Sequence, residues 1–224
     1  VCDVTGLSPE LVVHDPADTF LTPDSGNTTA SRQTVITGEA ARKAAGQLKK
    51  DMETASFHEL EGCEYYAEFE SVTDKMGSEK PHPVSHISYG YAVHLVILDD
   101  YGRIKKITAA HDVGRAINPK SVEGQIEGGV VMSMGYALTE NYPLKDCVPQ
   151  AKFGTLGLFR ADMVPDIESI VIGKAKDGFA RGAKGIGEIA AIPGAPAIQL
   201  AYYNRDGIFR TSLPLEYTPY SRKK

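Results

Sequence analysis

Residues 86–111 read HISYGYAVHLVILDDYGRIKKITAAH, two apolar runs separated by the short polar stretch DDYG. Branched and aromatic residues favour strands, and Asp with Gly favours the tight turn between them. The stretch therefore predicts a β-hairpin with strands over 86–98 and 103–111. Because hairpin strands are antiparallel, a regular alternation of parallel strands and helices is not expected here.

The segments on either side of this hairpin add helices and isolated strands. A long helix is predicted over 28–53, with apolar residues at every fourth position: Ile36, Ala40, Ala44, Leu48 and Met52. Further helices are predicted over 121–138 and 194–204, and further strands over 10–15, 63–72, 168–173 and 207–213. This mixed order predicts an α+β fold with mixed sheets and packed helices.

The composition is that of an ordinary globular protein and excludes several classes. The 224 residues carry a net charge of −5, with 24% charged and 42% apolar residues, which argues against nucleic-acid binding. No apolar stretch approaches the length of a membrane span. The three cysteines form no C-x-x-C pair, which argues against iron–sulfur or zinc sites on this chain and favours a cytoplasmic location.

The segment GNTTASRQT, residues 26–34, precedes or opens the long predicted helix. Asn27 or Thr28 can cap that helix, and capping alone is one interpretation. However, the first turn carries Arg32 and no acid, which is unfavourable next to the positive end of a helix dipole. A bound phosphate would reverse this, so an anion site is the second interpretation.

The segment GQIEGGVVMSMG, residues 124–135, places glycines inside a predicted helix. One face of that helix is an apolar stripe: Val122, Ile126, Val130, Met134 and Leu138. A neighbouring face carries Gln125 with Gly128, Gly129 and Met132. Since glycine destabilises a helix, either tight packing or a ligand held by the Gln125 amide is expected on that face.

The segment GAKGIGEIAAIPGAP, residues 182–196, surrounds a single carboxylate, Glu188, with glycines and small residues. Glycine permits backbone angles that could present the carboxylate into a sheltered cavity, where it could act as a general base. The alternative is a tight structural loop with an exposed acid. The glycine spacing fits neither a dinucleotide-binding fingerprint nor a P-loop.

Taken in series, TTASRQT (28–34), GRAINPKSVEGQIEGGVVMSMGYALTE (114–140) and GAKGIGEIAAIPGAPAIQLAY (182–202) resemble the molybdenum hydroxylases. This is the xanthine dehydrogenase and aldehyde oxidase family, and the match is to the C-terminal part of its molybdopterin-binding region. The resemblance implies that residues 1–224 form a single, incomplete molybdopterin-binding domain. It is closest to bacterial purine (xanthine-type) hydroxylases.

The resemblance also implies residue roles. Glu188 would be the catalytic base beside molybdenum, and Gln125 and Gly187 would lie at the cofactor. The residues expected around the pterin and its phosphate are Thr28, Ala30, Ser31, Arg32 and Gln33. No protein side chain would ligate the metal directly. Many family members have Pro directly after the catalytic Glu, whereas this chain has Ile189, so the local turn is expected to differ.

The implied activity is a xanthine dehydrogenase-like hydroxylation of an electron-poor carbon in a purine-like heterocycle or aldehyde, with oxygen from water. The cofactor would be molybdopterin in its cytosine dinucleotide form. The remaining half of the molybdenum domain, the iron–sulfur clusters and FAD are expected on other chains or segments, so the chain alone should be inactive. The alternatives are a non-catalytic binding or assembly module and an unrelated phosphate-binding enzyme.

Overall fold

The computed structural model describes residues 1–15, 17–173, 175 and 177–221, which form two compact units. The first unit comprises Val1–Tyr89 and Ala175–Gly185, and the second comprises Gly90–Lys174 and Ile186–Lys224. The assignment of residues 1–224 to a single incomplete domain stays a prediction. No helix in the described ranges is both long and apolar enough to span a membrane.

The first unit is built on one long helix. Its elements are α1 (Cys2–Thr5), the 3₁₀ turn η1 (Pro9–Leu11), α2 (Gln33–Asp51) and the 3₁₀ segment η3 (Phe179–Gly182). Helix α2 buries Val35, Glu39 and Ala45, and both α1 and η3 pack against it. The strand predicted over 10–15 is wrong, because this stretch is exposed and pairs with no strand among the described residues.

Helix α2 begins five residues later than predicted. Arg32 is its N-cap, and no side chain caps the first turn, so the predicted capping by Asn27 or Thr28 is wrong. The physical reason lies in the preceding backbone, where Ala30 and Ser31 both adopt positive φ, 49° and 52°. Left-handed residues interrupt a right-handed helix, so the chain turns there before α2 starts.

The strand predicted over 63–72 is also wrong, although its alternating pattern has a structural counterpart. Side chains at every second position are half-buried, but no strand forms. Two side chains of α2 reach this segment instead: Lys43 donates to the Glu68 carbonyl (3.1 Å) and Gln47 donates to the Tyr66 carbonyl (3.2 Å). The segment is therefore extended because it packs along a helix.

The second unit contains the predicted hairpin. Strand β1 (Tyr91–Leu98) pairs antiparallel with β2 (Ile104–Asp112), with His94 opposite Ala109 and Leu95 opposite Thr108. Asp99 fixes the turn, since its side chain accepts from the backbone N–H groups of Tyr101 (2.9 Å) and Arg103 (2.8 Å). This confirms the hairpin prediction.

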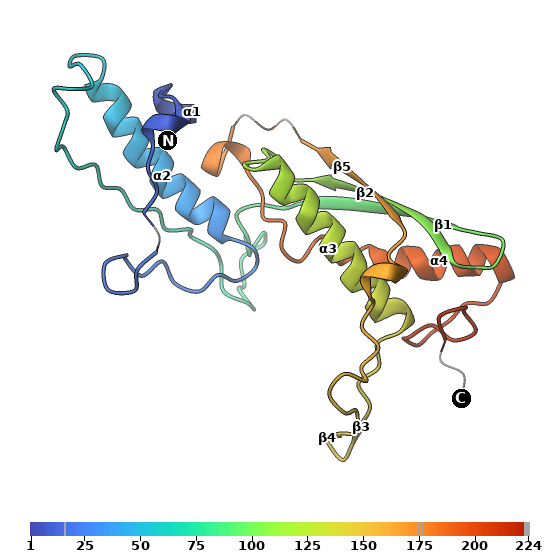
Figure 1. Cartoon of the computed structure of the whole chain (residues 1–224). Helices are drawn as coiled ribbons and strands as arrows, with labels where there is room; N and C mark the ends of the chain where they lie inside the picture. Colours follow the sequence, from blue (N-terminus) through green and yellow to red (C-terminus); the bar gives the residue numbers. More distant parts are fainter. Residues whose placement is uncertain (16, 174, 176, 222–224) are drawn as a thin grey trace. The chain divides into compact units, whose positions relative to one another are not determined.

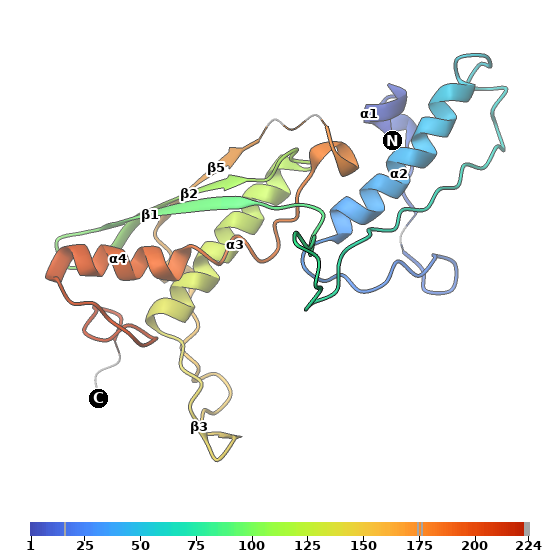
Figure 2. The same cartoon turned by 180° about the vertical axis from the view of Figure 1, so that it is seen from behind.

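A crossover helix completes a mixed sheet. After β2, α3 (Pro119–Leu138) precedes β5 (Asp166–Ile172), which lies parallel to β2 and gives the strand order β1-β2-β5. Helix α4 (Gly194–Asp206) packs against α3 and β1, and both views place α3 and α4 on one side of the sheet (Figure 1, Figure 2). The α+β prediction is confirmed.

The core of the second unit lies between the sheet and these two helices. The predicted stripe of α3 is buried throughout: Val122, Ile126, Val130, Met134 and Leu138. It packs with Ile107 and Ala109 of β2 and with Ile198 and Tyr202 of α4. The Tyr202 hydroxyl donates to the Gly102 carbonyl (2.7 Å), which ties α4 to the hairpin turn.

The remaining elements of the second unit are short. They are the two-residue strands β3 (Leu144–Lys145) and β4 (Val148–Pro149) and the 3₁₀ turn η2 (Ala161–Met163). The strand predicted over 207–213 is wrong, because side chains and not a neighbouring strand satisfy this segment. The Gln199 amide donates to the Arg210 carbonyl (3.2 Å), and the Arg210 guanidinium pairs with Asp206 (2.7 Å).

Candidate functional site

The residues before α2 form a compact polar turn in the first unit. Thr28 and Ala30 are exposed, and Ser31, Arg32 and Gln33 are half-buried. The Arg32 guanidinium folds back, donating from Nε and Nη2 to the Asn27 carbonyl (3.2 and 3.0 Å). The five predicted residues therefore lie together at the N-terminal end of a 19-residue helix.

The charges at this helix end favour an anion. The first turn of α2 contains no acidic residue, and Arg32 stands at its N-cap. The Gln33 amide donates to Ser25 Oγ (3.0 Å) and Thr37 Oγ1 (2.7 Å), but its Oε1 atom is buried without a partner. A helix N-terminus and a cation attract negative charge, and the unpartnered oxygen offers an acceptor to a ligand donor.

We call residues 26–34, 124–135 and 182–196 the first, second and third motifs. Gly185 of the third motif packs against the first motif within this unit. A Cβ atom at Gly185 would overlap the Ser31 carbonyl oxygen and lie 2.7 Å from Ser31 Cβ. A side chain at position 185 would therefore displace the backbone at Ser31. Glycine is required at 185 for close approach, so the loop before Glu188 is seated on the turn that precedes α2.

A buried carboxylate that sequence reasoning missed anchors the same loop. Glu39 of α2 is 3% exposed and accepts from Arg42 Nη2 (2.7 Å) and Nε (2.8 Å) and from the Ala180 N–H (2.8 Å). Ala180 and Arg181 both have positive φ, 48° and 58°. The Arg42 hydrogen bonds, assisted by the Ala180 N–H, lower the pKa of Glu39. Glu39 thus holds a strained turn of η3 in place.

In the second unit, Gln125 of α3 reaches the backbone of the third motif. Its Nε2 atom donates to the Gly187 carbonyl at 3.2 Å, although the two residues are 62 positions apart. Gln125, Gly187 and Glu188 are all exposed. The structure thus brings Gln125 and Gly187 into contact, and Glu188, which is also exposed, directly follows Gly187 in the chain.

The two helix glycines have different roles. A Cβ at Gly129 would overlap Ala190 Cβ and lie 2.7 Å from the Ala190 carbonyl carbon, so this glycine lets α3 pack tightly against the third motif. Of the two alternatives expected for this face, tight packing is therefore the one that the structure shows at Gly129. At Gly128 no atom lies within 4 Å of the Cβ position, and the residue is exposed, so this position can still face a ligand.

The expectation that Glu188 lies in a sheltered cavity is not met in this chain, where the side chain is exposed. The physical reason is that Ile189 turns toward the hairpin: its Cδ1 atom lies 2.9 Å from the Cβ position of Gly90. Ala190, which is fully buried, packs against α3. The apolar residues after Glu188 are thus directed into the unit, and the carboxylate projects outward.

A pair of buried histidines, also missed from the sequence, links β1 to β2. His94 Nε2 and His111 Nε2 lie 2.8 Å apart, and both side chains are buried. Burial, with the neighbouring His111, lowers the pKa of His94 to about 4, and burial also lowers the pKa of His111. The inward strand positions of both histidines were the signal available in the sequence.

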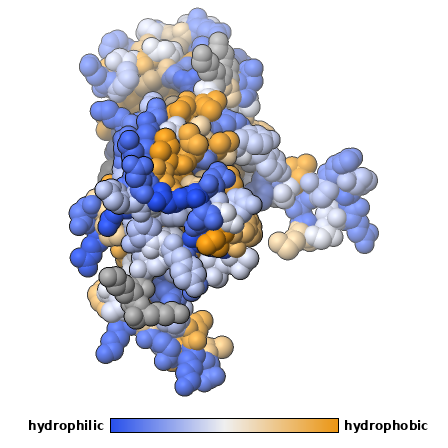
Figure 3. Space-filling view, turned by 90° about the vertical axis from the view of Figure 1, so that its right-hand side faces the viewer, coloured by the Kyte–Doolittle hydropathy of each residue, from blue (hydrophilic) through white to orange (hydrophobic). Residues whose placement is uncertain are grey.

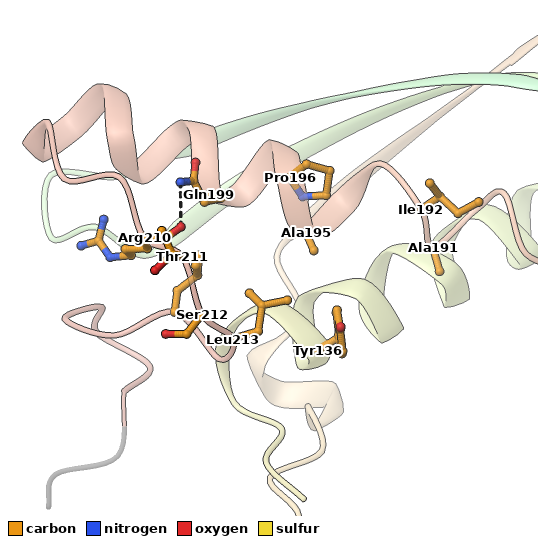
Figure 4. Close-up of a pocket in the computed structure, with 11 residues that line it drawn as sticks. Tyr136, Ala191, Ile192, Ala195, Pro196, Gln199, Arg210, Thr211, Ser212 and Leu213 are labelled. Carbon is orange, nitrogen blue, oxygen red and sulfur yellow. Dashed lines mark hydrogen bonds between the residues drawn. The ribbon is translucent and has the colours of Figure 1, made fainter.

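A pocket of about 440 Å³ lies elsewhere in the second unit, between α3, α4 and the segment after α4 (Figure 4). Its lining is mainly apolar or uncharged: Tyr136, Ala191, Ile192, Ala195, Pro196, Gln199, Arg210, Thr211, Ser212, Leu213 and Leu215. None of the predicted site residues lines it. Within the described ranges, no cluster of three or more His, Cys, Asp or Glu residues could hold a metal ion.

Comparison with known proteins gives a consistent result. The family model described as molybdopterin cofactor-binding domain matches residues 1–63 and 55–165. The gamma subunit of the 6-hydroxypseudooxynicotine dehydrogenase complex of Paenarthrobacter nicotinovorans is 29% identical, over 96% of this chain and 32% of its own length. A probable xanthine dehydrogenase subunit of Bacillus subtilis (strain 168) is also 29% identical, over 96% of this chain and 33% of its own length.

Solved structures show the same similarity. The aldehyde oxidoreductase from Desulfovibrio gigas matches 93% of this chain and 25% of its own chain, with 25% identity and a TM-score of 0.75. The aldehyde oxidoreductase from Desulfovibrio desulfuricans ATCC 27774 matches 82% of this chain and 22% of its own chain, with 27% identity and a TM-score of 0.67. The chain thus spans about a third of the length of the two curated relatives named above.

Proposed function

Because the chain belongs to the molybdopterin cofactor-binding domain family, we propose that it forms part of the cofactor site of a xanthine dehydrogenase-like molybdenum hydroxylase. The proposed reaction is hydroxylation of an electron-poor carbon in a purine-like heterocycle or an aldehyde. The contact between Gln125 Nε2 and the Gly187 carbonyl carries the proposal, since it joins two of the three motifs beside Glu188.

The residues present fit a large, phosphate-bearing cofactor. The Cβ position of Gly128 is open, and Gly187 is exposed, so a ligand can approach both backbones closely. In the first unit, the buried and unpartnered Gln33 Oε1 calls for a donor, and the acid-free start of α2 suits a phosphate. These features support cofactor contacts in each unit, without any metal ligand from a protein side chain.

The proposed binding roles follow from these positions. Thr28, Ala30, Ser31, Arg32 and Gln33 hold the pterin and its phosphate through the turn before α2. Gln125 donates through its amide and orients the backbone at Gly187. When bound, the cofactor supplies the two-electron redox chemistry and the water-derived oxygen. The cytosine dinucleotide form of the cofactor, and iron–sulfur clusters and FAD on partner chains or segments, are part of the proposal.

Glu188 is proposed as the general base. Its exposed side chain directly follows Gly187, which Gln125 contacts, so a proton from a group bound there is within its proposed reach. A cavity around Glu188 then has to be completed by polypeptide outside this chain, which fits relatives about three times as long. The chain alone is proposed to be inactive.

The test is Glu188→Gln in the assembled complex, compared with Glu127→Gln. Glu127 is an exposed acid of α3 and serves as the matched control. Glu188→Gln should lower turnover by at least about 10²-fold, the usual scale for losing a general base, with molybdenum content unchanged. Glu127→Gln should retain turnover. Normal turnover of Glu188→Gln with full molybdenum would exclude Glu188 as the base and leave residues 182–196 as a tight structural loop.

A further inference from the structure

The outward face of β1 is apolar along its whole length. Its outward side chains are Tyr91, Val93, Leu95 and Ile97, which are 71%, 70%, 60% and 42% exposed. Ile170 and Ile172 of β5, which stand opposite Ala110 and Asp112 of β2, are 40% and 53% exposed. We call the four outward residues of β1 the β1 patch; Ile170 and Ile172 lie beyond β2, at the other edge of the sheet. Figure 3, a space-filling view coloured by hydropathy, shows hydrophobic side chains gathered in patches on one face of the chain.

The neighbouring part of the same sheet face is polar and internally paired. Lys106 of β2 forms an ion pair with Glu168 of β5 (2.8 Å), and Thr108 donates to the same carboxylate (3.0 Å). This is how a sheet face that meets water is normally built, with polar residues at alternate positions. The β1 patch breaks that pattern, and an exposed apolar patch of this kind is typical of an interaction site.

The free edge of β1 also indicates an interaction site. Among the described residues, β1 pairs only with β2, so it is an edge strand of eight residues, YAVHLVIL. Natural edge strands are usually protected by lysine, proline, a bulge or a short length. This strand has no charged residue and no proline, and its single irregularity lies at the Ile97/Leu98 end. Its remaining length offers backbone groups to an added strand.

We propose that β1 docks an extended segment of the polypeptide that supplies the part of the relatives' length outside this chain. The two curated relatives named above are matched over only 32% and 33% of their length, so about two thirds of such a protein remains to provide the occupant. The segment adds a strand to the edge of β1 and carries apolar side chains at alternate positions, which lie beside the outward side chains of the β1 patch. This inference rests on the proposed function.

The first experiment identifies the occupant in the purified complex. A photoreactive benzoylphenylalanine replaces Leu95, and mass spectrometry of the cross-linked peptide identifies the attached segment. The expected result is a segment of the companion polypeptide that matches the remaining length of the relatives. Attachment to a second copy of this chain, or to a helix of the companion, would overturn the proposal.

The second experiment measures the edge itself by hydrogen–deuterium exchange in the unmodified complex. A strand paired on both edges protects all of its amides, whereas a free edge leaves alternate amides exposed. Amides of residues 92–98 should therefore exchange within tenfold of those of the central strand β2. Alternate amides of β1 that exchange at least a hundredfold faster than β2 would overturn the proposal.

The third experiment weakens the contact without disturbing the fold. Leu95→Lys places a charge in the β1 patch and should reduce the yield of assembled complex at least tenfold. Leu158→Lys makes the same change at a comparably exposed site (64%) and should leave assembly unchanged. Equal yields from both variants would overturn the proposal. Molybdenum per assembled wild-type complex is measured separately, so absent molybdenum would reject the proposed function while leaving the docking result intact.

Discussion

The two units of the chain are each stabilised internally by a different kind of interaction. The second unit has a continuous apolar core of thirteen buried residues between its sheet and two helices. The long helix of the first unit buries only Val35, Ala45 and the charged Glu39. There, hydrogen bonds from side chains to backbone, such as Lys43 to Glu68 and Gln47 to Tyr66, take the place of a sheet.

This difference shows why the two units should respond differently to substitution. Burial of apolar surface is additive and strong, at about 25 cal/mol per Å². A typical hydrogen bond contributes only about 1 kcal/mol net, but a buried polar group that loses its partner is destabilising by about 1–3 kcal/mol. The second unit should therefore be sensitive to lost volume, and the first unit to lost partners.

The largest effect is expected from removing volume in the core of the second unit. Ile126 of α3 is 0% exposed, so Ile126→Ala should lower the free energy of unfolding by about 2–5 kcal/mol. Leu48→Ala is the counterpart on α2, where the side chain is only half-buried, and its effect should be smaller. Hydrogen exchange of β2 and α2 amides measures the two units separately. If both variants lost the same free energy of unfolding, the two units would not differ in their sensitivity to lost volume.

A smaller effect is expected from removing the buried carboxylate of the first unit. Glu39→Ala leaves the buried Ala180 N–H without its acceptor, and Arg42 without its partner, so the free energy of unfolding should fall by about 1–3 kcal/mol. Glu39→Gln keeps an acceptor for Ala180 and should lose less. Urea titration followed by exchange of the α2 amides measures both. A Glu39→Ala chain as stable as the parent would show that this carboxylate is dispensable.

A gradual loss of stability is expected on acidification, and it should begin in the second unit. The pKa of His94 is about 4 in the folded chain, below its ordinary value of 6.5, so the unfolded chain binds the proton first. Stability is therefore complete above pH 6.5 and falls toward pH 4, by at most about 1.4 kcal/mol per pH unit for this group. The lowered pKa of Glu39 acts only below 4.5, where protonation removes stability from the first unit.

Unfolding followed at pH 7, 5.5 and 4.5 tests this order. In the parent chain, exchange of β1 and β2 amides should accelerate between pH 6.5 and 4.5, after correction for the intrinsic rate, while α2 amides change little. His94→Leu removes one of the two buried histidines with a lowered pKa and should reduce the pH dependence. An unchanged slope in that variant would assign the acid sensitivity to other groups.

The sequence predicted those parts of the fold whose structure depends only on the residues of one continuous segment. The hairpin follows from its own strands and turn, and α3 follows from a stripe whose five members are all buried. The strand predicted over 63–72 is wrong because alternation indicates a half-buried extended segment but not the neighbour that covers it. In this chain the neighbour is α2, which no local pattern specifies.

In the candidate site, too, local sequence identified individual residues but not the contacts between distant segments. The motifs single out Gln125, Gly187 and Glu188 individually, but the contact between Gln125 and Gly187 depends on how α3 packs against the third motif. The start of α2 could not be predicted, since positive φ at Ala30 and Ser31 is not indicated by either residue type. The roles of the individual site residues remain predictions that the substitutions above address.

The contact between Gly185 and Ser31 also has a consequence for synthesis on the ribosome. The first unit combines Val1–Tyr89 with Ala175–Gly185. The second of these segments is therefore translated only after most of the second unit. At a translation rate of about 5–20 residues per second, roughly 5–20 s pass between synthesis of the first segment and synthesis of the second. During that interval the turn before α2 lacks Gly185, which packs against Ser31 in the folded unit. The nascent chain thus completes its N-terminal unit late, after the hairpin and α3 have already left the exit tunnel.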